Sequence, residues 1–298
     1  MLKRLLWFVC FLPLPGALLG QSCVPAVQFE PTIKAPIHNV TFTNDAVFPP
    51  EKEAEIAQAL RDKTVAPGSL DKTMSSIAEE AAERARAAYQ DLGYFKARVD
   101  GKAVSVATRP PQYDIMIQIR SVGKQYRLGD LNILHAPSFP TQQLRDQFPI
   151  QRGEIFSREK IAVGLEALRR LYGSEGYLNY TSVPETEFDN ENAIANLTMD
   201  TDEGTQFHLR GVEVLGVDTE TKDRMLSELD LKPGDLFNSE VWERSFQKFH
   251  GLARDPKTVD RKLDEQNGLV DVVLDFRQPR PCRVLYSGPP SLLRPSTK

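Results

Sequence analysis

The sequence has few of the residues on which metal and redox sites depend. Its 298 residues include three cysteines and four histidines, and none of them shows the spacing of a zinc site or of a Cys-x-x-Cys redox pair. It contains no glycine-rich phosphate loop and no Gly-x-Ser-x-Gly nucleophile motif. Acidic pairs such as Glu79-Glu80 lie on polar helical faces, where charged side chains are normally solvated. We therefore predict no enzyme activity, no catalytic residue, no metal site and no cofactor.

An excess of positive charge is also missing. The 37 basic residues are outnumbered by 41 acidic ones, which gives a formal net charge of −4. Binding to a nucleic-acid backbone depends on a concentrated positive field, so we predict no nucleic-acid partner. Peripheral association with a membrane stays open.

The sequence lacks an apolar run of membrane-spanning length. Residues 5–19 are mostly apolar and follow Lys3 and Arg4, but about 15 residues fall short of the roughly 20 that span a bilayer. Gly20 and Ser22 offer small residues for cleavage, so we predict a signal peptide at residues 1–22 and hence export. An uncleaved membrane anchor is the alternative.

Removal of a signal peptide would determine which cysteines stay in the exported protein. Cys10 would leave with the signal peptide, so the mature chain keeps Cys23 and Cys282. These two could pair in an oxidising compartment, or Cys23 could be lipidated, and the sequence leaves both alternatives open.

What the sequence does have is a segment that occurs three times. A turn glycine followed by an apolar residue and a helix start recurs at Gly68, Gly153 and Gly234. The spacing of about 80 residues suits small domains in series better than a short-period solenoid. The glycine allows a turn with positive φ, and a polar residue after it can cap the helix. The predicted caps are Asp71, Ser157 and Asn238.

Each copy has the same predicted order of elements. A strand is followed by a short helix, the glycine turn and a longer helix with apolar residues spaced by threes and fours. Two more strands then follow, most clearly at residues 113–119, where apolar and polar residues alternate. The first strands are predicted at 37–43, 126–134 and 207–215, and the least regular strand at 258–263.

This order predicts an α+β fold of three tandem β-α-α-β-β repeats. In each repeat, two helices would cover one face of a three-stranded mixed sheet, because each element must bury its apolar face against another. We place the repeats at 30–122, 123–203 and 204–278, followed by a proline-rich tail at 279–298.

Two further patterns accompany the repeats. A Gly-aromatic step follows the long helix at Gly93-Tyr94 and Gly176-Tyr177, and the copies join almost without linker at Gly123 and Gly204. With the element order and the turn glycines, these patterns resemble the POTRA (polypeptide-transport-associated) family of outer-membrane β-barrel assembly and transport proteins. The third copy departs from the pattern because it has no Gly-Tyr step. The resemblance covers roughly residues 37–277.

The resemblance implies a periplasmic scaffold or receptor associated with the outer membrane. Its expected partners are an outer-membrane β-barrel protein or its assembly machinery, and extended client polypeptides. In the family's best-known members such repeats lead into a transmembrane barrel, whose strands alternate over about ten residues. After residue 277 only the proline-rich tail follows, so we expect no membrane insertion by this chain itself.

The resemblance also implies where clients would bind. In the family, the strand after the Gly-aromatic step lies at a sheet edge, where unpaired backbone groups can bind an extended segment by β-augmentation. Those strands correspond here to residues 94–106 and 177–188, and for each of their apolar side chains core packing is the competing role. The candidate client-binding residues are Tyr94, Phe95, Ala97, Val99, Tyr177, Leu178 and Tyr180.

Two other roles stay open. The repeats could be rigid spacers that hold another module at a distance, because the junctions at Gly123 and Gly204 are short. A POTRA-like module of a membrane-anchored cell-division or envelope complex would also fit, and it would keep the N-terminal apolar segment as an anchor.

Overall fold

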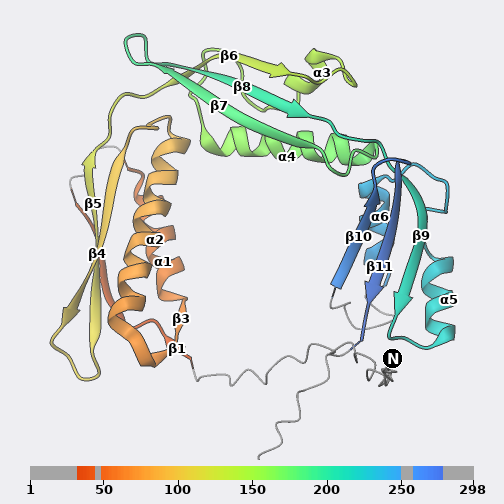
Figure 1. Cartoon of the computed structure of the whole chain (residues 1–298). Coiled ribbons are helices and arrows are strands. Elements are labelled where there is room, and N and C mark those ends of the chain that lie inside the picture. The colour runs from red at the N-terminus through yellow and green to blue at the C-terminus, as the bar shows by residue number, and fades with distance from the viewer. Residues whose placement is uncertain (1–31, 44–47, 250–257, 278–298) are drawn as a thin grey trace, which may run out of the picture. The chain divides into compact units, whose positions relative to one another are not determined.

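Three hydrophobic cores follow one another along the chain. The computed structural model describes residues 32–43, 48–249 and 258–277 (Figure 1). The predicted signal peptide, all three cysteines and the proline-rich tail lie outside the described residues.

The first repeat forms a three-stranded sheet in the order β2-β5-β4, with β2 parallel and β4 antiparallel to the central strand. The helices α1 and α2 pack against each other, and α2 also packs on β4 and β5. Two short strands, β1 and β3, add a small antiparallel pair that the sequence pattern does not predict. The elements are β1 (Ile33–Lys34), β2 (Ile37–Thr43), α1 (Pro50–Arg61), β3 (Thr64–Val65), α2 (Leu70–Asp91), β4 (Arg98–Val106) and β5 (Gln112–Ser121).

The second repeat has the same topology, with its sheet in the order β6-β8-β7. Its first helix is a single short turn, while its second is a full helix that covers the core. The elements are β6 (Arg127–Leu134), α3 (Thr141–Arg145), α4 (Arg158–Ser174), β7 (Thr181–Asp189) and β8 (Ile194–Asp202).

The third repeat has the same topology, with its sheet in the order β10-β11-β9. The strand that was least regular in sequence is present as β10 and pairs antiparallel with β11. The elements are β9 (His208–Leu215), α5 (Thr219–Ser227), α6 (Ser239–Gln247), β10 (Thr258–Asp264) and β11 (Leu269–Asp275).

The central strands explain why this sequence folds into sheets with one covered face. In β5, Ile115 and Ile117 are fully buried against the helices, whereas Met116 between them is exposed. In β8, Leu197 and Met199 are buried in the same alternation. A period of two places one set of side chains against the helices and the other in solvent. The predicted α+β fold of three β-α-α-β-β repeats is therefore confirmed.

The three turns are less alike than the sequence predicts. Gly153 and Gly234 have φ values of +87° and +94°, a region that favours glycine. Gly68 instead lies in a short 3₁₀ turn at Pro67–Ser69 and does not have a positive φ.

The predicted helix caps differ in the same way. Ser157 and Asn238 accept backbone N–H bonds at the starts of α4 and α6. The prediction for Asp71 is wrong, because this residue lies inside the first turn of α2 and accepts a hydrogen bond from the hydroxyl of Tyr113 at 2.6 Å.

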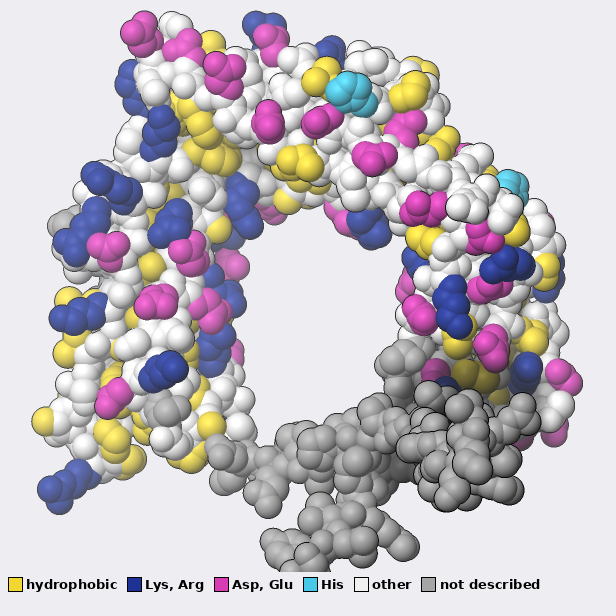
Figure 2. Space-filling model, viewed as in Figure 1, with side chains coloured by type: hydrophobic (Ala, Val, Ile, Leu, Met, Phe, Trp, Pro, Cys, Tyr) yellow, Lys and Arg dark blue, Asp and Glu magenta, His cyan; other side chains and the backbone are white. Residues whose placement is uncertain are grey.

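The helices and the surface charges bear on membrane association. No helix among residues 32–43, 48–249 and 258–277 is long and apolar enough to cross a membrane. On the face in view in Figure 2, the described Lys and Arg side chains are interspersed with Asp and Glu.

Candidate partner-binding edges and repeat junctions

The sheet order places β4, β7 and β10 at edges, each bonded to its central strand on one side only. The strands predicted from residues 94 and 177 begin later, at Arg98 and Thr181. The Gly-aromatic steps therefore lie in the turns before the edge strands rather than in the strands themselves.

The edge strand β4 is long and contains no proline. It covers nine residues, and Val104 is 38% exposed. One of its faces lies very close to α2, because a Cβ built on Gly101 would lie 1.8 Å from the carbonyl oxygen of Ala78. The helix backbone thus supports the strand along one face, while the outer backbone groups of β4 pair with no other strand in the described chain.

The edge strand β7 is less suited to pairing. Pro184 has no N–H group, and Glu185 and Glu187 are exposed beside it. Proline and charged residues on edge strands are known devices against unwanted strand addition. Val183 is 60% exposed and is the one large apolar side chain on this strand that solvent reaches freely.

The four candidate residues of the first repeat are already packed within the protein. Ala97 and Val99 are 5% and 3% exposed and belong to the first core. Tyr94 packs on the same core, with its ring 6.3 Å from that of Tyr89. Phe95 packs instead in the second core, 4.7 Å from the ring of Phe156.

The three candidate residues of the second repeat divide in the same way. Tyr177 and Tyr180 pack on the second core, and Tyr180 stacks on Tyr172 with ring centroids 4.1 Å apart. Leu178 packs instead against the third core. Contact of these seven side chains with a client stays a prediction, and all seven are already engaged in the protein's own packing.

A tyrosine and carboxylate network lies beside Tyr177. The carboxylate of Glu203 accepts hydrogen bonds from the Tyr172 hydroxyl at 2.8 Å and from the Ser138 hydroxyl at 2.6 Å. The Ser138 and Tyr177 hydroxyls also bond at 2.9 Å. Burial, with the nearby Glu203 carboxylate, raises the pKa of Tyr172 well above its usual range, so this hydroxyl stays protonated and remains a donor. The network links α4, the end of β8 and the loop after β6.

The Gly-aromatic steps are where one repeat meets the next. The carbonyl of Gly93 accepts the N–H of Tyr126 at 2.9 Å, and the carbonyl of Gly176 accepts the N–H of Phe207 at the same distance. Both glycines have positive φ, and a Cβ on Gly93 would lie 2.9 Å from Ile155. Glycine is therefore needed at this step for backbone conformation and for close approach.

Two glutamines reinforce the junctions in matching positions. The amide of Gln125 donates to the carbonyl of Leu92 at 2.9 Å, and that of Gln206 donates to the carbonyl of Glu175 at 2.8 Å. Both accepting carbonyls belong to the residue directly after the preceding long helix. The recurring Gly-x-Gln pattern at the junctions was the signal in the sequence, but only the structure shows this role.

The tips of the β7–β8 and β10–β11 hairpins also form hydrogen bonds with the preceding repeat. Between β7 and β8, Asn190 accepts a hydrogen bond from Lys96 of the first repeat and one at 2.7 Å from Lys124 of its own repeat. The Lys96 ammonium also lies 5.5 Å from the ring centre of Phe188, within cation–π range. At the second junction Asn179 donates to Glu265 at 3.2 Å. Sequence reasoning missed these residues because the partners lie 66 or more positions apart.

Clusters of metal-ligating side chains are also absent from the described residues. Among those residues, no three His, Cys, Asp or Glu side chains come together in a way that could hold a metal ion.

Comparison with known proteins matches the second repeat to a family model. Residues 126–204 match POTRA, described as a surface antigen variable number repeat. This match begins at Tyr126, the residue bonded to Gly93, and ends at Gly204.

Two curated relatives extend the similarity along the chain. An outer membrane protein assembly factor of Treponema pallidum (strain Nichols) is 25% identical over 222 residues, which is 72% of this chain and 26% of that protein. The outer membrane protein assembly factor BamA of Buchnera aphidicola subsp. Acyrthosiphon pisum is 25% identical over 157 residues, which is 52% of this chain and 25% of that protein. The chain thus spans about a quarter of the length of these relatives.

A solved structure shows the same fold. The crystal structure of the third to fifth POTRA domains of Haemophilus influenzae BamA aligns with a TM-score of 0.65 at 19% identity, and it covers 84% of this chain and 98% of that one. The family match thus assigns a POTRA domain to residues 126–204, and the solved structure shows that the described chain shares the fold of tandem POTRA domains.

Proposed function

We propose that this chain is an exported, periplasmic scaffold for outer-membrane protein assembly or polypeptide transport. Its curated relatives are named as outer membrane protein assembly factors. The described residues form three repeats joined by short junctions, and each repeat has a sheet with edge strands. The expected partners are an outer-membrane β-barrel protein or its assembly machinery, and extended client segments.

The proposed mode of binding is β-augmentation, and the free edge of β4 is the observation that supports it. Backbone groups along this edge can pair with an extended partner, and such pairing tolerates many sequences. The close packing of α2 on Gly101 holds the strand in place, so less conformational entropy is lost on binding. We propose β4 as the main edge and β7 as a weaker one, because Pro184 removes a donor there.

A second role, spacing, is supported by the junction contacts. The same Gly, aromatic and Gln bonds occur at both junctions, and each restrains one repeat against its neighbour. Spacing and client binding are compatible. A spacer in a membrane-anchored envelope complex would need the junctions but not the edge of β4.

Photocrosslinking in cells that produce the protein separates these roles. Probes at Lys102 and Val104 should capture extended partners if β4 is a receptor edge, and the adducts can be identified by mass spectrometry. A probe at Glu185 on β7 should capture less, and one at the exposed Ser76 on α2 serves as the matched control. A folded, exported protein with equal yields at β4 and Ser76 would contradict β-augmentation and leave the spacer role.

A further inference from the structure

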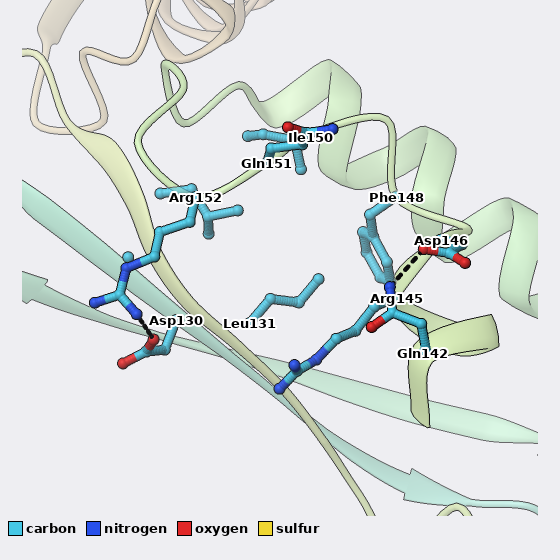
Figure 3. A pocket seen from close by; sticks show the side chains of 11 residues that line it. Asp130, Leu131, Gln142, Arg145, Asp146, Phe148, Ile150, Gln151 and Arg152 are labelled. Carbon is cyan, nitrogen blue, oxygen red and sulfur yellow. Dashed lines mark hydrogen bonds and ion pairs between the residues drawn. The ribbon is translucent and has the colours of Figure 1, made fainter. Parts of the chain in front are cut away.

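A cavity of about 470 Å³ lies at the other edge of the second sheet. It is bounded by the start of β6, the short helix α3 and the loop that leads to Gly153 (Figure 3). This edge lies across the sheet from β7, because β8 separates the two strands. The lining residues that carry the argument are Leu131, Arg145, Phe148, Ile150 and Arg152.

The start of β6 has a bulge on the side that faces β8, and its other side bonds the loop at residues 153 and 154. The pairing with β8 shifts between Leu128 and Leu131, and the N–H of Asp130 bonds the side chain of Asn196 at 2.8 Å instead of the ladder. Glycine at position 129 leaves room for this contact, because a Cβ there would lie 2.1 Å from the Asn196 side-chain oxygen. Beyond the bulge, the described chain bonds residues 131–134 of β6 on the β8 side only.

The floor of the cavity is apolar. Phe148 and Ile150 are buried, and Leu131 is half-buried between the two arginine side chains in the view of Figure 3. An apolar floor beside an open strand edge suits the side chain of an extended segment. A volume of this size admits a few side chains rather than a folded domain.

The charged side chains around the floor differ in their bonding partners. Arg152 forms an ion pair with Asp130 at 2.6 Å, and Asp146 accepts a hydrogen bond from Gln142 at 2.7 Å. The guanidinium of Arg145 forms no ion pair or hydrogen bond with any residue in the described parts of the chain. Its guanidinium lies on the same side of the cavity as Leu131 in Figure 3. The site therefore offers an unpaired guanidinium at Arg145 next to an apolar floor, while the Asp146 carboxylate is bonded to the neutral amide of Gln142.

We propose that this cavity binds an extended segment of a partner polypeptide that carries an acidic residue beside a bulky apolar one. The carboxylate would pair with Arg145, whose planar guanidinium matches carboxylate geometry in a bidentate fork. The apolar side chain would cover Leu131 and Phe148. This second binding surface is independent of the edge of β4.

A peptide titration of the full chain tests the proposal. The probe is a fluorescein-labelled nonapeptide of alternating Val and Thr with one central Glu beside a Leu, and a second peptide has Gln in place of that Glu. The Glu peptide should bind about tenfold more tightly than the Gln peptide, and the difference should shrink at high salt. Arg145→Gln should abolish the difference.

A matched variant and a mapping step make the result decisive. Arg170 on α4 is also exposed, and its guanidinium has no ion pair or hydrogen bond within the described residues, so Arg170→Gln should leave the affinity unchanged. A benzophenone version of the Glu peptide should crosslink near Leu131 or Ile150. Absence of saturable binding, an unchanged affinity in Arg145→Gln, or crosslinks confined to β4 would each overturn the proposal.

Discussion

Three glycines at equivalent turns have different physical roles. A Cβ on any of Gly68, Gly153 or Gly234 would meet nothing within 4 Å, so space does not explain them. Gly153 and Gly234 have a positive φ that other residues adopt only with strain, whereas Gly68 does not. The first glycine is thus replaceable, and the other two are required by their backbone conformation.

The first prediction compares two of these turns. Gly153→Ala should lower the free energy of unfolding of the second repeat by about 1 to 2 kcal/mol, because an L-residue is strained at this φ. Gly68→Ala should be neutral or raise stability by about 0.5 kcal/mol, because alanine loses less backbone entropy on folding. Hydrogen exchange of amides in α4 and α2, respectively, measures the two effects. Equal losses in both variants would show that φ is not the cause.

At the scale of elements, the pair of α2 and β4 distinguishes the first repeat. The helix buries an alanine-rich face in which Ala78, Ala81 and Ala85 are fully buried. Small side chains allow the helix backbone to approach the strand, and Gly101 lies where the two meet. The strand proposed to receive clients is therefore supported from behind by a helix.

The second prediction tests this close approach. Gly101→Ala should destabilise the first repeat by about 3 kcal/mol, the upper end of overpacking effects, because the new Cβ would collide with the Ala78 carbonyl. The neighbouring Lys102→Ala, at an exposed position, should change stability by less than about 0.5 kcal/mol. Hydrogen exchange of α2 and β4 provides the measurement. Full protection of β4 in Gly101→Ala would argue against close packing of α2 on Gly101.

At the scale of the molecule, each junction places a side chain of one repeat in the hydrophobic core of the next. After each Gly-aromatic step, the aromatic residue packs in its own repeat and the next residue packs in the core that follows. Tyr94 and Phe95 divide in this way between the first and second cores. Tyr177 and Leu178 do the same between the second and third. The step is therefore a coupling element between neighbouring cores.

The third prediction concerns this coupling. Phe95→Ala should destabilise the second repeat by about 2 to 3 kcal/mol, slightly less than a fully buried phenylalanine would, although Phe95 precedes β4 of the first repeat. Tyr94→Ala, its neighbour, should instead destabilise the first repeat. Hydrogen exchange of α2 and α4 distinguishes the two outcomes. Loss of protection in the first repeat alone from Phe95→Ala would contradict the assignment.

Much of the fold could be predicted because its signals are local. The strand predicted at residues 37–43 coincides with β2, and the alternation at 113–119 lies within β5. Hydrophobic periodicity acts over a few residues, so it is visible in sequence. The small β1–β3 pair and the shortness of α3 were not predicted, since a two-residue strand and a one-turn helix have too few residues to show a period.

The candidate site was less predictable. The edge positions of β4 and β7 were expected, but the side chains selected beside them are engaged in the protein's own cores. Whether Phe95 faces solvent or Phe156 depends on residues 61 positions away, and no local pattern records that contact.

The sequence by itself determined the order and type of the elements, because apolar spacing and turn residues act on neighbouring positions. The tertiary structure alone decided which side chains couple the repeats, which edge stays open and where Arg145 meets an apolar floor. Those features arise from packing between segments far apart in the chain, where burial and charge compensation depend on every group that surrounds a residue.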